Sequence, residues 1–97
     1  MIKDGPEFED LSDHAKRHSD IGGGDVASYY NSAVMHTAKA KYKFRVTHNG
    51  QTKFAFVTPL QDGSFMFTSA NISGKRIFTH LKVDANYLAR KGITLPQ

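Results

Sequence analysis

The sequence contains no cysteine and no tryptophan, and only three of its 97 residues are proline. Without cysteine the chain has no disulfide, no thiolate zinc site and no cysteine nucleophile. No apolar run approaches the roughly 18 residues of a membrane-spanning helix, and the first residues lack the apolar segment of a signal peptide. We therefore expect no membrane insertion by this domain.

Length and composition indicate one folded domain. A chain of 97 residues is too short for two domains of ordinary size. Its 39% hydrophobic and 23% charged residues are typical of a globular protein rather than a disordered one. We assign residues 1–10 to a linker or lead-in and residues 11–97 to a single domain.

The net charge of +4 is unevenly distributed along the chain. Residues 1–25 carry seven acidic and three basic side chains, whereas residues 26–97 carry two acidic and ten basic ones. The larger segment is therefore strongly basic, which makes polyanions plausible partners. The alternative is a solvated basic face that only keeps the protein soluble.

The first third of the chain has helical spacing. Leucine, alanine and histidine recur on one face between residues 11 and 18, which predicts a short helix capped by Asp10 or Ser12. Three glycines at 22–24 end this helix. Asp25 is a favourable N-cap for a second helix over residues 26–38.

The rest of the chain has the period of strands. Asn49-Gly50 is a strong hairpin turn, and Pro59 and Asp62-Gly63 end the next strand. Asp84 and Gly92 are placed to begin and end a last short helix. We predict an α+β fold in which N-terminal helices pack on a four-stranded antiparallel sheet and a short C-terminal helix follows, with the helices segregated onto one face of the sheet. The predicted strands cover residues 41–48, 51–58, 64–70 and 75–83.

The Asn49-Gly50 turn fixes which side chains share a face of the first hairpin. The face expected to form the core under the helices holds Tyr42, Phe44, Val46, Ala55 and Val57. The other face holds Lys41, Lys43, Arg45 and Thr47 beside Phe54 and Phe56. This second set either binds phosphates and unstacked bases, or a β-bulge shifts the register and the two phenylalanines are core.

Two histidines one turn apart form the densest polar cluster. His14 and His18 would lie on one helix face, and Lys16 and Arg17 stand between them in the sequence. Because imidazole titrates near neutral pH, such a pair suits general acid–base catalysis. A zinc site would need a third ligand, and His36, His48 and His80 stand at no diagnostic spacing. The structural alternative is one partly buried and one surface histidine.

Cleavage of RNA without a metal needs a base, an acid and cations against the charge that builds on the phosphorane. Hydroxyl side chains on the strands can add hydrogen bonds to the phosphate oxygens. The alternative is that these threonines and serines are ordinary surface residues of the sheet with no ligand. The candidate catalytic residues are His18, His14, Arg17 and Thr79. The candidate RNA-binding residues are Lys16, Lys43, Arg45, Thr68, Ser69 and Arg76.

Residues 14–95 resemble the barnase/EndoU/colicin/RelE superfamily of toxin ribonucleases, and within it the colicin D-like tRNA nucleases. The likeness rests on Arg17-His18-Ser19-Asp20-Ile21-Gly22, the later His36, the turn at Asp62-Gly63-Ser64-Phe65 and the ending Lys91-Gly92-Ile93. The resemblance implies that His18 is the catalytic histidine and that Arg17 contacts the phosphate. The additional His14 departs from the pattern and leaves the identity of the base open.

The resemblance implies a bacterial toxin ribonuclease that cleaves tRNA or other RNA by metal-independent transesterification, with no cofactor. Such domains end contact-dependent growth inhibition or type VI effectors, so we expect a larger secreted or cell-surface protein that acts in the target-cell cytoplasm. We also expect a cognate immunity protein, acidic to match the basic segment, and a toxin that is monomeric when free. The alternative is a non-catalytic nucleic-acid-binding or protein-interaction module.

Overall fold

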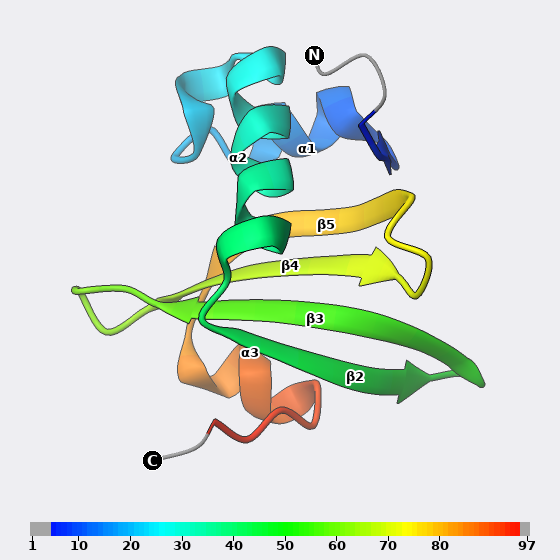
Figure 1. The fold of residues 1–97 in the computed structure, drawn as a ribbon. Coiled ribbons are helices and arrows are strands. Elements are labelled where there is room, and N and C mark those ends of the chain that lie inside the picture. Colours follow the sequence, from blue (N-terminus) through cyan, green and yellow to red (C-terminus); the bar gives the residue numbers. More distant parts are fainter. Residues whose placement is uncertain (1–4, 96–97) are drawn as a thin grey trace.

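The computed structural model describes residues 5–95, apart from the side chain of His48, and has an α+β architecture (Figure 1). Residues 1–4 of the predicted lead-in lie outside the described residues. The helices are α1 (Leu11–Arg17), the 3-10 helix η1 (Gly22–Gly24), α2 (Val26–Lys39) and α3 (Ala85–Arg90). The strands are β1 (Glu7–Phe8), β2 (Tyr42–His48), β3 (Gln51–Pro59), β4 (Phe65–Asn71) and β5 (Arg76–Val83).

The sheet has five strands in the order β1-β5-β4-β3-β2, and it is mixed rather than purely antiparallel. Strands β2 to β5 form the predicted antiparallel meander, but β1 pairs with β5 in parallel. The prediction of four antiparallel strands was therefore incomplete. Sequence periodicity missed β1 because a strand of two residues is too short to show alternation.

The hairpin register agrees with the prediction from the Asn49-Gly50 turn. Arg45 lies opposite Phe54 and Lys43 opposite Phe56, with no bulge between β2 and β3. An irregularity occurs instead between β4 and β5, where the pairing shifts between Ser69 and Ala70. The faces of the first hairpin are thus the predicted ones.

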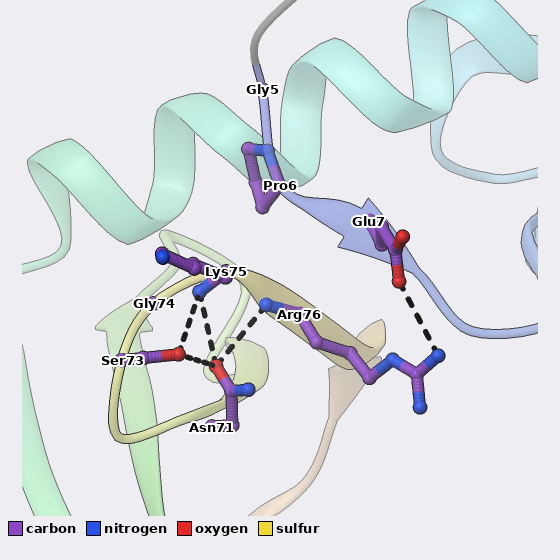
Figure 2. A pocket seen from close by; sticks show the side chains of 8 residues that line it. All are labelled: Gly5, Pro6, Glu7, Asn71, Ser73, Gly74, Lys75 and Arg76. Atoms are coloured by element: carbon purple, nitrogen blue, oxygen red, sulfur yellow. Dashed lines mark hydrogen bonds and ion pairs between the residues drawn. The ribbon is translucent and has the colours of Figure 1, made fainter.

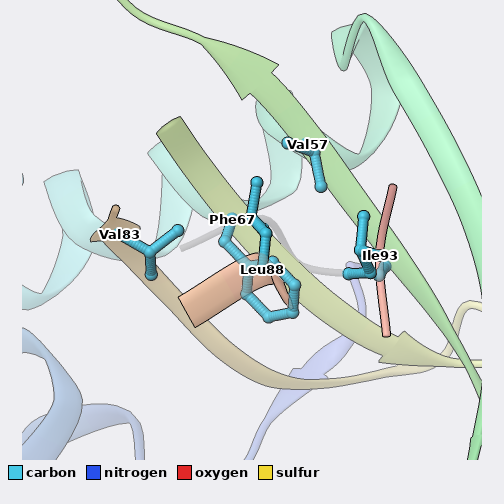
Figure 3. Close-up of a cluster of buried hydrophobic side chains, with 6 residues drawn as sticks. Val57, Phe67, Val83, Leu88 and Ile93 are labelled. Atoms are coloured by element: carbon cyan, nitrogen blue, oxygen red, sulfur yellow. The ribbon is translucent and has the colours of Figure 1, made fainter. Parts of the chain in front are cut away.

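The helices cover both faces of the sheet, which corrects the expectation that all helices share one face. The face with Ala55 and Val57 packs against Leu88 of α3 and the following Ile93 (Figure 3). The opposite face packs against α2, where Ala33 meets Phe56. The set Tyr42, Phe44, Val46, Ala55 and Val57 is therefore core, but under the C-terminal segment rather than the N-terminal helices.

Local sequence explains where the helices begin and end. The Asp25 carboxylate accepts a hydrogen bond from the Ser28 backbone N–H at 2.9 Å, and Asp84 does the same for Tyr87 at 2.9 Å. Gly92 (φ 75°) follows α3 in the left-handed region, and the N–H of Ile93 donates to the Leu88 carbonyl. Asp10 precedes α1 with φ 53°, and its side chain makes no capping bond.

Gly22 provides a close approach that no other residue type permits. Its φ is +76°, and a Cβ there would lie 2.9 Å from the backbone nitrogen of Tyr29. We expect Gly22→Ala to lower the free energy of unfolding by about 2–4 kcal/mol, because left-handed strain adds to a clash with backbone. Gly24→Ala is the matched control, since Gly24 has φ +88° but open space around it. Equal losses for the two variants in urea unfolding would contradict this assignment.

Within residues 5–95 no helix is long and apolar enough to cross a membrane.

Candidate functional site

Helix α1 brings the two predicted histidines together. The rings of His14 and His18 are 5.8 Å apart between centroids, and both side chains are half-buried. The His18 ring stacks on Tyr29 of α2, with centroids 6.3 Å apart and an interplanar angle of 18°. The ring of Phe8 of β1 lies 5.3 Å from that of His14 and 5.4 Å from that of Tyr29 between centroids. One cluster of aromatic rings from β1 and α2 thus packs against the two histidines.

Burial and charge make both imidazoles weak bases. Burial, followed by the nearby Arg17 guanidinium, lowers the pKa of both His14 and His18 below 6.5. The Nδ1 atom of His14 is buried and has no hydrogen-bond partner. Lys16 and Arg17 are exposed and make no ion pair with a described carboxylate. Neutral imidazoles beside the Arg17 guanidinium can exchange protons next to a bound anion.

A second pair of histidines forms a buried hydrogen-bonded chain between α2 and the sheet. His36 bonds Thr58 at 2.8 Å and Thr68 at 2.7 Å. Thr68 also bonds Nδ1 of His80 at 2.6 Å, and Nε2 of His80 bonds Ser32 at 2.9 Å. Each described ring nitrogen of these histidines has a partner, so this chain fixes α2 on the sheet.

Burial determines the charge state of this chain. His80 and Thr68 are fully buried, and burial lowers the pKa of His80 to about 3 and that of His36 to about 4. The hydroxyl of Tyr29 donates to the His80 carbonyl, and burial raises the pKa of Tyr29 above its usual value. Thr68 was predicted to contact RNA, but its hydroxyl is inaccessible and already bonded on two sides.

The structure separates the predicted site residues onto two faces of the sheet. Ser69 and Thr79 lie opposite each other on β4 and β5, on the face that carries α3. Thr68 and His80, one residue away in each strand, lie under α2 because side chains alternate along a strand. One phosphate therefore cannot contact both the α1 histidines and the Ser69–Thr79 pair.

The Ser69–Thr79 pair lines a groove of about 400 Å³ beside α3. Lys53 of β3 and the consecutive Arg90 and Lys91 at the end of α3 also line it. The sequence did not single out these three cations. The strand register could have found Lys53, because it places Lys53, Ser69 and Thr79 on neighbouring strands of one face.

The predicted basic face of β2 exists, but its aromatic residues are largely core. Lys43 and Arg45 are exposed, and the Lys43 ammonium lies 4.1 Å from the centroid of the Phe54 ring. Phe56 is buried against Ala33 of α2, and Phe54 packs beside the same cluster. The cations therefore lie over a packed apolar surface rather than between free stacking platforms.

Arg76, a predicted phosphate contact, is paired with carboxylates of the N-terminal segment. Its guanidinium lies 3.3 Å from Glu7 (Figure 2) and 3.5 Å from Glu9. Asn71 orders the same turn by accepting bonds from the backbone N–H groups of Lys75 and Arg76. A hollow of about 720 Å³ opens there, next to Gly5 and Pro6.

Over the described part of the chain, no three histidine or carboxylate side chains are grouped so that they could hold a metal ion. No protein-family model, curated protein or solved structure matches this chain. The candidate site therefore rests on the residues of α1 and on their surroundings.

Proposed function

We propose that this protein is an RNA endonuclease that cleaves tRNA or other RNA by metal-independent acid–base transesterification. The observation that carries the proposal is the His14–His18 pair, with ring centroids 5.8 Å apart and pKa values below 6.5. Lys16 and Arg17 of the same segment make no ion pair with a described carboxylate. This set supplies a base, an acid and positive charge within one helical turn.

In the proposed reaction one neutral imidazole removes the proton of the ribose 2′-hydroxyl. The 2′-oxygen attacks phosphorus, and the bond from phosphorus to the 5′-oxygen breaks as the second, protonated imidazole gives that oxygen its proton. The products are a 2′,3′-cyclic phosphate and a 5′-hydroxyl. Arg17 stabilises the charge on the phosphorane, and Lys16 binds the adjacent backbone. His18 takes the principal role, because it stacks on Tyr29 and is held in one orientation.

A second candidate function is binding of nucleic acid without chemistry. The exposed cations in and directly before β2 favour it, because Lys41, Lys43 and Arg45 alternate along one sheet edge without a described ion-pair partner. The two candidates are separated by incubating the purified protein with total RNA in excess chelator. Discrete fragments support the endonuclease, and intact RNA that is nevertheless retained by the protein supports the binding module.

The β2 cations give a prediction that holds for both candidates. We expect Lys43→Gln and Arg45→Gln each to weaken RNA binding and to reduce the slope of log K against log salt by about 0.7 for a single strand. Lys75→Gln removes one exposed charge elsewhere and is the control. Fluorescence anisotropy across a salt series measures the slopes. An unchanged slope in both β2 variants would show that Lys43 and Arg45 do not contact the RNA phosphates.

The same charges bear on the proposed protein partner. A ribonuclease that attacks the RNA of its own producer requires an inhibitor, so we propose a cognate acidic immunity protein that covers the RNA site. Arg45 is exposed and makes no ion pair within residues 5–95, which suits an interface hot spot. Arg76 already pairs with Glu7 and Glu9 and is the weaker candidate for a hot spot.

We further propose that this domain is delivered as the end of a larger secreted effector and acts in the target-cell cytoplasm. The free toxin domain is proposed to be a monomer.

A further inference from the structure

The groove beside α3 is separate from the α1 histidines, and its chemistry is that of an anion site. Lys53 enters it from β3, whereas Arg90 and Lys91 enter it from the end of α3. None of these three cations forms an ion pair with a carboxylate within residues 5–95. Three unpaired cations from two separate elements therefore converge on one hollow.

Two hydroxyl groups add directional donors to this charge. Ser69 and Thr79 are directly opposite each other on β4 and β5, and both line the groove. No described side-chain hydrogen bond uses either hydroxyl, although Ser69 is only 9% exposed as a residue. By contrast, the hydroxyl of the neighbouring Thr68 bonds two histidines. The groove hydroxyls are thus free to donate to a ligand oxygen.

The remaining wall is aromatic and apolar. Phe67 and Tyr87 meet edge to face at 5.3 Å, and Val46 completes this side. The volume of about 400 Å³ lies within the roughly 300–1,000 Å³ of small-molecule sites. A ligand that matches these walls has a phosphate at one end and a flat ring at the other.

For two of the three cations, Arg90 and Lys91, the helix dipole of α3 is a simpler explanation than a bound anion. Arg90 and Lys91 complement the negative end of the helix dipole wherever they point. Lys53 has no such role, because it belongs to β3. Its ammonium lies 4.6 Å from the Phe78 ring centroid, a cation–π contact that leaves its charge without a counter-ion within residues 5–95. The helix dipole also gives no reason for the hydroxyls of Ser69 and Thr79 to lie in the groove without a described hydrogen bond.

We propose that this groove binds the phosphate of a nucleotide, with Lys53, Arg90 and Lys91 around the phosphate and Tyr87 beside the base. The proposal does not depend on ribonuclease activity, since the groove lies on the sheet face opposite α2. The phosphate belongs either to a free mononucleotide or to the 5′ end of an RNA strand.

Calorimetric titration with adenosine 5′-monophosphate and with adenosine tests the proposal. We expect the monophosphate to bind at least tenfold more tightly, and Lys53→Gln to weaken it about tenfold. Thr79→Val tests the hydroxyl without changing charge, and we expect a several-fold loss. Lys75→Gln, an exposed cation at the β4–β5 turn, is the control and leaves the affinity unchanged. Arg90→Gln replaces Lys53→Gln if circular dichroism shows that the latter does not fold.

Each outcome bears on the groove alone. Absence of monophosphate binding at about 5 mM, equal affinity for adenosine, or an equal loss in Lys75→Gln overturns the proposal. A 5′-phosphorylated RNA oligonucleotide that competes better than its 5′-hydroxyl counterpart identifies the strand end as the source. Failure of both oligonucleotides to compete identifies the free nucleotide. His18→Ala that loses cleavage but keeps monophosphate affinity shows that the two sites are independent.

Discussion

Replacement of His18 by alanine is expected to lower the rate of RNA cleavage by about 10²–10⁴-fold while the protein remains folded. His18 is half-buried and stacks on Tyr29, so its imidazole is held in one orientation beside Arg17. Alanine removes the proton-transfer group, and His18 is the C-cap that follows α1, so the residues of the helix itself are unchanged. Single-turnover cleavage of a labelled RNA measures the rate, and circular dichroism checks the fold.

His14→Ala is the comparison within the same helix, and its loss is expected to be smaller. The His14 ring contacts the rings of Phe8 and His18, and its Nδ1 atom is buried without a hydrogen-bond partner among the described residues. Lys75→Gln changes a charge outside α1 and is expected to cleave normally. Equal and trivial effects of His14→Ala and His18→Ala would remove the active site from this helix.

The two histidines also predict the pH dependence of cleavage. The reaction needs one neutral and one protonated imidazole, so the rate is highest between their two pKa values. Burial and Arg17 lower both values below 6.5, which places the optimum on the acidic side of 6.5. Arg17→Gln removes one cause of the lowering and is expected to move the optimum upward as it slows the reaction.

A large loss of stability in mild acid is expected from the buried histidine chain. The pKa of His80 is about 3 in the folded protein and near 6.5 in the unfolded chain, so below pH 6.5 the unfolded state binds more protons. Stability is therefore full above pH 6.5 and declines as the pH falls toward 3. At pH 5 His80 alone accounts for a loss of roughly 2 kcal/mol. His36, with a pKa of about 4, adds to the loss in the same direction.

Urea unfolding at a series of pH values measures this effect. A loss of this size is a large part of the about 5–15 kcal/mol that stabilises an ordinary domain. His80→Phe fills similar space without titrating, so its stability should fall less between pH 6.5 and 5. His36→Gln provides the same comparison if His80→Phe does not fold. A wild-type free energy of unfolding that is constant from pH 7 to 5 would show that these histidines do not control stability.

Local signals predicted most of the fold. The Asn49-Gly50 turn gave the register of β2 and β3, and Asp25 and Asp84 marked the starts of α2 and α3. Strand β1 was missed because it has two residues and exists only through its pairing with β5. The distribution of helices over the two faces was also missed, because both faces of β3 are apolar and periodicity cannot assign a helix to either.

The site was predicted less completely than the fold, because it depends on contacts between distant residues. Helical spacing brought His14 and His18 together, and the structure agrees. The ion pairs of Arg76 with Glu7 and Glu9 depend on the unpredicted strand β1. The burial of Thr68 depends on His36 and His80, which are 32 and 12 residues away in the chain. Composition and spacing carry no information about such long-range partners.

The most direct measurement of the proposed chemistry is the identity of the new RNA ends, determined by mass spectrometry after cleavage in excess chelator. Transesterification by the α1 histidines predicts a 2′,3′-cyclic phosphate and a 5′-hydroxyl at each cut, formed by the wild-type protein and lost in His18→Ala. New 3′-hydroxyl and 5′-phosphate ends, cleavage that stops in chelator, or RNA that stays intact at every pH from 5 to 8 would contradict it.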